Sequence, residues 1–84
     1  VFNAIAEPRR RALLDALAAS SPRDVSDLAA ELRWPQPDVS KHLAVLRQVG
    51  LVSMTKEGKR RLYQLEPQEL KRVHDWVKSF EHYW

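Results

Sequence analysis

The chain has only two glycines, and the first of them, Gly50, closes a stretch in which apolar residues recur at helical spacing. Val39, Leu43 and Leu46 stand at positions i, i+4 and i+7, which places them on one face of a helix. Gly50 follows where a helix favours a left-handed C-cap. The polar residues of the stretch crowd its N-terminal half. We therefore expect a helix over about 36–49 with a buried apolar face and a polar front end.

The second glycine, Gly58, predicts a hairpin directly after that helix. It lies in KEGK, between the strand-like runs LVSMT and RRLYQL. A glycine between two such runs favours a tight β-turn. Basic residues cluster at this tip, namely Lys56, Lys59, Arg60 and Arg61. A protruding basic loop can lie along a sugar–phosphate backbone or insert an arginine into a minor groove.

Helix-start signals mark the other helices. Pro8 follows an acid and suits the first turn of a helix, and Asp24 with Asp27 three residues later resembles a capping box. The two helices that follow have apolar stripes formed by Leu13, Leu14, Leu17 and Ala18, and by Val25, Leu28, Ala29 and Leu32. We expect a short opening helix or turn at Phe2 and Ile5, and a final helix from Pro67 to Trp84.

Composition limits the class of protein. A chain of 84 residues forms one small domain, and it buries only about 60–65% of its unfolded surface, so a second chain could add core. The net charge of +3 mildly favours a polyanionic partner. The absence of cysteine excludes disulfides and thiolate metal sites, and we expect a cytoplasmic protein with no membrane segment. Because the chain opens on Val1 and ends on Trp84 within an apolar helical pattern, both ends look trimmed.

Two short helices joined by a tight turn and followed by a hairpin predict a winged helix-turn-helix. The fold class is then mainly α (α+β), with one domain over 1–84 and a two-stranded wing. A recognition helix enters the major groove by its N-terminal end, so polar residues belong there. Its opposite face packs on the preceding helices, which explains the apolar residues. This arrangement predicts binding to double-stranded DNA.

Four segments carry a resemblance to a known family: EPRRRALLDAL, DVSDLAAEL, QPDVSKHLAVLRQVGLV and EGKRRLYQL. They resemble the ArsR family of dimeric winged-helix transcriptional repressors, and the ending LKRVHDWVKSFEHYW is similar to its non-metal branch. The resemblance implies base-facing residues in the second helix of the motif and a dimer interface made by the first and last helices. The chain departs from the family pattern at Arg33, where the turn usually has Gly, and at Pro35, where a Ser or Thr cap is usual.

The expected DNA-binding residues follow from these patterns. Gln36 can pair with adenine, Lys41 suits guanine or phosphate, and Ser40 is small enough for close approach to a base. His42 suits a phosphate or structural role better than base readout. The full expected set is Gln36, Ser40, Lys41, His42, Arg47, Lys56, Lys59, Arg60 and Arg61. The alternative is that the helix residues are simply solvated and that the charged hairpin tip protects a sheet edge.

The last helix carries a heptad-like apolar seam at Leu70, Val73, Val77, Phe80 and Trp84. The seam is long and aromatic for so small a core, so we expect a homodimer; the alternative is that it packs on its own domain. The expected interface residues are Phe2, Ile5, Leu70, Val73, Trp76, Val77, Phe80, Tyr83 and Trp84. A two-fold dimer would place two recognition helices about 34 Å apart, which predicts a palindromic operator.

Other functional classes fit less well. A metal sensor is suggested by four residues near the end of the chain: His74, Asp75, Glu81 and His82. Metal-sensing members of the family resemble an Asp-x-His pattern, but here Asp75 is followed by Trp76 and Val77, so the histidine of that pattern is missing. We expect no metal, no cofactor and no enzymatic activity, because no phosphate loop or activated nucleophile pattern is present. The remaining alternative is a winged-helix protein–protein interaction module that does not bind DNA.

Overall fold

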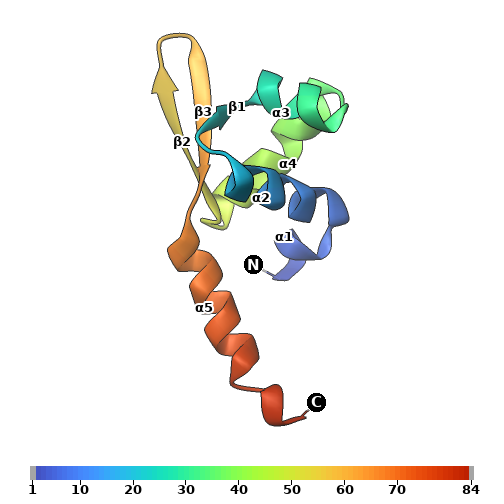
Figure 1. Ribbon diagram of the computed structural model, residues 1–84, viewed down its shortest axis with the longest axis vertical. Coiled ribbons are helices and arrows are strands. Elements are labelled where there is room, and N and C mark those ends of the chain that lie inside the picture. Colours follow the sequence, from blue (N-terminus) through green and yellow to red (C-terminus); the bar gives the residue numbers. More distant parts are fainter. Residues whose placement is uncertain (1, 84) are drawn as a thin grey trace.

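The computed structural model describes the backbone of residues 2–83 and the side chains of residues 4–82 (Figure 1). Its elements are α1 (Phe2–Ala6), α2 (Pro8–Ala19), β1 (Arg23–Asp24), α3 (Val25–Leu32), α4 (Gln36–Gln48), β2 (Val52–Glu57), β3 (Arg60–Leu65), α5 (Pro67–Lys78) and the 3-10 helix η1 (Glu81–Tyr83). The helices α3 and α4 with the hairpin of β2 and β3 form a winged helix-turn-helix, as the sequence predicted.

Side-chain caps fix two of the helix starts. The Glu7 carboxylate accepts a hydrogen bond from the backbone N–H of Arg9 at 3.0 Å, and the Asp24 carboxylate accepts one from the N–H of Asp27 at 2.8 Å. Both caps satisfy backbone donors that the first turn of a helix leaves unpaired. The start of α4 differs, because Pro35 is its N-cap and forms no side-chain cap. Its carbonyl instead accepts bonds from the N–H groups of Asp38 and Val39.

The turn between α3 and α4 passes through Arg33, which has left-handed backbone angles (φ 59°, ψ 42°). The N–H of Trp34 then donates to the carbonyl of Ala29 at 3.1 Å, which closes the end of α3. A side chain with a Cβ is strained in this conformation, and glycine is not. Arg33 therefore stands in a backbone conformation that suits glycine better, which agrees with glycine being the usual residue here in the family that the sequence resembles.

We expect Arg33→Gly to stabilise the domain by about 1 kcal/mol, because it relieves this backbone strain at a position outside the core. A gain of that size raises the Tm by about 4–8 °C in a domain of this length. Ala30→Gly is the control, since Ala30 is exposed inside α3 and glycine there should lower the Tm. A lower Tm for Arg33→Gly in a thermal melt would contradict the strain.

The sheet has three antiparallel strands in the order β1-β3-β2, so the expectation of a two-stranded wing was wrong. The hairpin pairs Val52 with Leu65 at its base and Glu57 with Arg60 at its tip. The added strand β1 has only two residues and pairs Asp24 with Leu62. A two-residue strand is too short to show an alternating pattern, and its partner lies far along the chain. It joins the wing to the start of α3.

The core lies where α2, α3 and α4 meet the base of the sheet (Figure 1). Eight side chains are almost completely buried: Leu13, Leu17, Leu28, Val39, Leu43, Leu46, Leu51 and Val52. They include the three residues that defined the apolar face of the central helix. That face therefore fixes the orientation of α4, and its opposite face is left outside.

The last helix, α5, leaves the sheet and extends away from the rest of the domain (Figure 1). It contains no fully buried residue. It ends at Lys78, so the expectation of a helix reaching Trp84 was wrong, and Trp84 itself lies outside the described residues. The Ser79 hydroxyl donates to the carbonyl of Trp76, and the Phe80 N–H donates to the carbonyl of Val77, which tightens the chain into η1. Within the described range, no helix is long and apolar enough to cross a bilayer.

Candidate nucleic-acid interface

The recognition helix α4 presents a polar surface at its N-terminal half. Gln36, Ser40 and Lys41 are all exposed. The apolar face of the same helix is fully buried, with Val39 and Leu43 at 0% exposure. The core thus holds α4 so that its predicted base-facing residues lie on the exposed side of the helix. A helix presented in this way can enter a DNA major groove.

The wing carries a second basic surface. Lys56, Lys59 and Arg61 are exposed, and their side chains form no hydrogen bond or ion pair within the part of the chain that the structure describes. Gly58 forms the tip with φ +64°, and no atom lies within 4 Å of the place where its Cβ would be. Three cations at the open end of the hairpin can contact phosphates without first breaking internal contacts.

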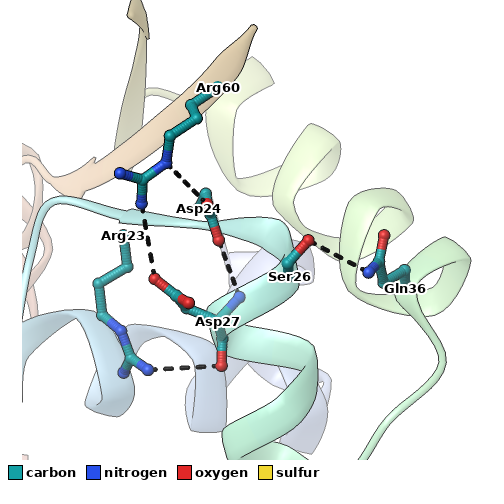
Figure 2. A network of polar contacts seen from close by, with 6 residues as sticks. All are labelled: Arg23, Asp24, Ser26, Asp27, Gln36 and Arg60. Atoms are coloured by element: carbon teal, nitrogen blue, oxygen red, sulfur yellow. Dashed lines mark hydrogen bonds and ion pairs between the residues drawn. The ribbon is translucent and has the colours of Figure 1, made fainter.

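The first turn of α3 lies between these two surfaces (Figure 2). The Gln36 side chain donates a hydrogen bond to the Ser26 hydroxyl at 3.2 Å. On the other side, the Nε of Arg60 donates to the Asp24 carboxylate at 3.0 Å, and an Nη of Arg60 lies 3.7 Å from the Asp27 carboxylate. The start of α4 and the wing therefore each contact the start of α3 through one side chain, Gln36 from α4 and Arg60 from the wing.

These contacts affect the ionisation of Asp24. Its pKa is lowered, first by the hydrogen bond from the Asp27 backbone N–H and further by the Arg60 guanidinium. Asp24 is therefore a carboxylate at neutral pH, and Arg60 neutralises it. Arg23 extends the network, since it forms an ion pair with Glu31 at 2.9 Å and donates to the Asp27 carbonyl (Figure 2 shows the latter bond).

Two of the predicted DNA-binding residues lie apart from this group. His42 is half-buried, and its Nδ1 has no hydrogen-bond partner among the described residues. The pKa of Glu7 at the start of α2 is lowered by the hydrogen bond from the Arg9 N–H and, more weakly, by His42. His42 thus lies on the side of α4 that faces α2, which fits a structural role. Arg47 is exposed in the last turn of α4, about 16 Å along the helix from Gln36.

A third surface is apolar and runs from α1 to α5; we name it the dimerisation surface because the sequence predicts its residues as a dimer interface. Ile5 and Leu70 line a mainly apolar hollow of about 390 Å³, together with Leu14, Ala18 and Leu65 and the charged residues Arg11 and Asp15. Further along α5, Val73 and Val77 are half-buried and Trp76 is 54% exposed, and Phe80, just after the end of the helix, is 40% exposed. These two rings meet edge to face with centroids 4.8 Å apart. The side chains of Phe2 and Tyr83, and all of Trp84, lie outside the described residues.

Metal ligands do not come together in the described residues, where no group of three His, Cys, Asp or Glu side chains could hold an ion. The histidine of α5, His74, lies beside Asp75 with an N–O distance of 3.4 Å, and both side chains are largely exposed. Among the described residues, this pair has no third ligand beside it.

The sequence model for bacterial regulatory proteins of the arsR family matches residues 7–54, more than half of the chain. This chain belongs to the ArsR family. The matched segment contains α2, α3 and α4 and reaches into β2, so it spans the whole helix-turn-helix. Family membership agrees with the geometry, since it concerns the same elements that present the polar surface of α4.

Named relatives and solved structures agree with this membership. The transcriptional repressor SdpR of Bacillus subtilis is 31% identical over 95% of this chain and 88% of its own length. A crystal structure of a possible transcriptional regulator for arsenical resistance has a TM-score of 0.84 and 38% identity, and covers 94% of this chain and 81% of that one. The homodimeric winged helix-turn-helix DNA-binding domain of Mb0332 from Mycobacterium bovis has a TM-score of 0.76 and 30% identity, over 92% and 70% of the two chains.

All three are named as transcriptional regulators or possible regulators, and none is named as an enzyme. The chain is a winged helix-turn-helix transcriptional regulator of the ArsR family. The sequence did not predict that Asp24, Ser26 and Asp27 contact residues of the interface. The signal for Asp24 was its helix-capping pattern, which is local. Its contact with Arg60 spans 36 residues and leaves no local signal.

Proposed function

We propose that this chain acts in the cytoplasm as a homodimeric, sequence-specific DNA-binding repressor. The observation that carries the proposal is the common turn at the start of α3, which contacts both Gln36 and the wing residue Arg60. The polar front of α4 and the basic wing are thereby held on neighbouring parts of one surface. One element can enter the major groove while the other lies along the adjacent backbone. Repression is supported by the name of the Bacillus subtilis relative.

In this proposal the two surfaces have different tasks. Gln36, Ser40 and Lys41 contact base edges, which gives sequence specificity. Lys56, Lys59 and Arg61 contact phosphates, which adds affinity for any sequence and makes binding sensitive to salt. His42 and Arg47 take supporting roles at the helix edges.

The homodimer is proposed from the dimerisation surface. A helix with no fully buried residue, an exposed Trp76 and an apolar hollow at its base gains stability if a second copy covers it. The homodimeric solved structure from Mycobacterium bovis supports the same arrangement. The proposed domain is therefore one winged-helix unit over 1–84 whose last segment, about 67–84, pairs with its copy. The two α4 helices would then read an inverted repeat.

The experiment that tests this division of tasks compares two variants on DNA at several salt concentrations. Ser40→Ala with Lys41→Ala should weaken binding by about 1–3 kcal/mol for each base pair that is no longer read, and should leave binding to random duplexes nearly unchanged. Lys59→Ala with Arg61→Ala should weaken binding to all sequences, and should reduce the slope of log K against log salt by about 0.9 for each phosphate that is no longer neutralised. Fluorescence anisotropy measures both effects.

Equal losses for both variants on all sequences would show that α4 does not read bases. If the unaltered protein bound no duplex even at low salt, the DNA-binding proposal would fail. The winged-helix protein–protein interaction module would then be the better account.

A further inference from the structure

Arg60 differs from the other basic residues of the wing because acidic side chains already hold it. Its Nε donates to Asp24 at 3.0 Å, and its Nη2 lies 3.7 Å from the carboxylate of Asp27 (Figure 2). The neighbouring cations Lys59 and Arg61 form no such pairs in the described structure. The two carboxylates belong to Asp24, the N-cap of α3, and to Asp27 in the first turn of α3, and the fork-shaped guanidinium contacts both.

A phosphate contact by Arg60 would disturb this arrangement. The Asp24 side chain is only 19% exposed and depends on Arg60 as its cationic partner. If Arg60 turned to a phosphate, the negative charges of Asp24 and Asp27 would be left uncompensated close to the DNA. Asp24 also caps α3, so it cannot move away with Arg60. The cost of these two unpaired charges would oppose the gain from one phosphate contact.

The same turn also holds the recognition helix. Ser26, one residue from Asp27, accepts the hydrogen bond from Gln36 in the first turn of α4. The backbone adds a further connection, because Asp24 pairs with Leu62 between β1 and β3. Side-chain bonds and strand pairing therefore link the wing to α3, and α3 to the front of α4. The first turn of α3 lies where it can set the distance between the two DNA-contacting elements.

We propose that Arg60 is a positioning residue which, through Asp24 and Asp27, holds the wing at a fixed distance and angle from α4. The phosphate contacts of the wing then come from Lys56, Lys59 and Arg61. This inference rests on the proposed DNA-binding function. It replaces the simpler expectation that all four basic residues of the wing contact phosphate in the same way.

The first test is Arg60→Lys, which keeps the charge and removes the fork that reaches both carboxylates. On the operator duplex that the unaltered protein selects, we expect affinity to fall about fivefold with an unchanged salt slope, because every phosphate contact is kept. A phosphate-contacting residue would tolerate lysine, since lysine serves phosphate as a point charge. Arg72→Lys is the matched control, because Arg72 is an exposed arginine of α5 that pairs with Glu69 at 3.5 Å and has no proposed contact with DNA. The affinity of this variant should stay near that of the unaltered protein.

The second test is Asp24→Ser, which keeps a good helix cap and removes the partner of Arg60. If Arg60 is a positioning residue, this variant lowers the ratio of operator to random-duplex affinity, and adding Arg60→Lys causes little further loss. If Arg60 contacts phosphate, removing the acid frees it and raises affinity for every duplex. Glu57→Gln removes one negative charge elsewhere on the wing. It measures how much the affinity for DNA rises from the loss of an acidic charge alone.

Amide hydrogen exchange of the free protein gives a reading that does not involve DNA. Exchange over 56–61 should become faster in Arg60→Lys and in Asp24→Ser, and should not change in Glu57→Gln. Unchanged exchange, or a salt slope that falls in Arg60→Lys, would overturn the positioning role and leave the DNA-binding proposal intact. Failure of the unaltered protein to bind any duplex would overturn both proposals.

Discussion

Replacing Val77 by aspartate is expected to give a folded monomer that no longer binds its operator tightly. Val77 is half-buried on the apolar seam of α5, and the helix extends away from the core (Figure 1). A carboxylate at this seam would have to be buried between the two copies, which costs several kcal/mol. A monomer binds one half-site instead of two, so we expect the operator affinity to fall by about 100-fold or more. Sedimentation equilibrium, circular dichroism and anisotropy measure assembly, folding and binding.

The matched control for this variant is Gln68→Asp. Gln68 is exposed near the start of α5, so the same charge is added to the same helix outside the seam. An acid in the first turn is also favourable to the helix dipole. This variant should remain dimeric and bind its operator. A Val77→Asp protein that is still dimeric would show that α5 is not the interface.

Replacing Leu46 by alanine is expected to have the largest effect on stability. Leu46 is fully buried in α4, within the core formed with α2 and α3. Truncation of a buried leucine costs about 2–5 kcal/mol, which includes the cavity that it leaves. A small domain has a free energy of unfolding of only about 5–15 kcal/mol, so much of the stability would disappear. Urea unfolding, monitored by circular dichroism, measures the change.

The control for the core variant is Gln48→Ala, two residues further along the same helix. Gln48 is exposed, so its truncation should change the free energy of unfolding by less than about 0.5 kcal/mol. If Leu46→Ala lowered the free energy of unfolding by less than about 1 kcal/mol, the loss would be well under the cost of truncating a buried leucine. The apolar face of α4 would then not be what holds this helix in the core. Burial of that face could then not explain why Gln36, Ser40 and Lys41 lie on the exposed side of the helix.

The order of helices and the hairpin could be predicted from sequence because their signals are local. Val39, Leu43 and Leu46 show a helical period, and Asp24 and Gly58 mark a cap and a turn within a few residues. These features depend on backbone geometry that neighbouring residues set. The orientation of α4 followed from the same pattern, since the apolar face had to be inside.

The missed features depend on contacts that a sequence pattern does not display. The strand β1 exists only through its pairing with β3, and at the early end of α5 the Ser79 hydroxyl donates a hydrogen bond to the carbonyl of Trp76. The contacts of Arg60 were missed because they join distant parts of the chain. Its position in a basic run favoured a phosphate contact, but the fold places it against two carboxylates at the start of α3. A run of basic residues in the sequence does not show which of them form ion pairs with acidic residues in the fold.

The central claim is that a dimer of this chain reads a specific DNA sequence. The measurement that tests it most directly is selection from random duplex DNA with the purified protein, followed by sequencing of the bound fraction. The account predicts enrichment of an inverted repeat whose half-sites are centred about one helical turn apart, roughly 34 Å. Bound DNA without any enriched motif, or no bound DNA at low salt, would contradict sequence-specific reading by α4.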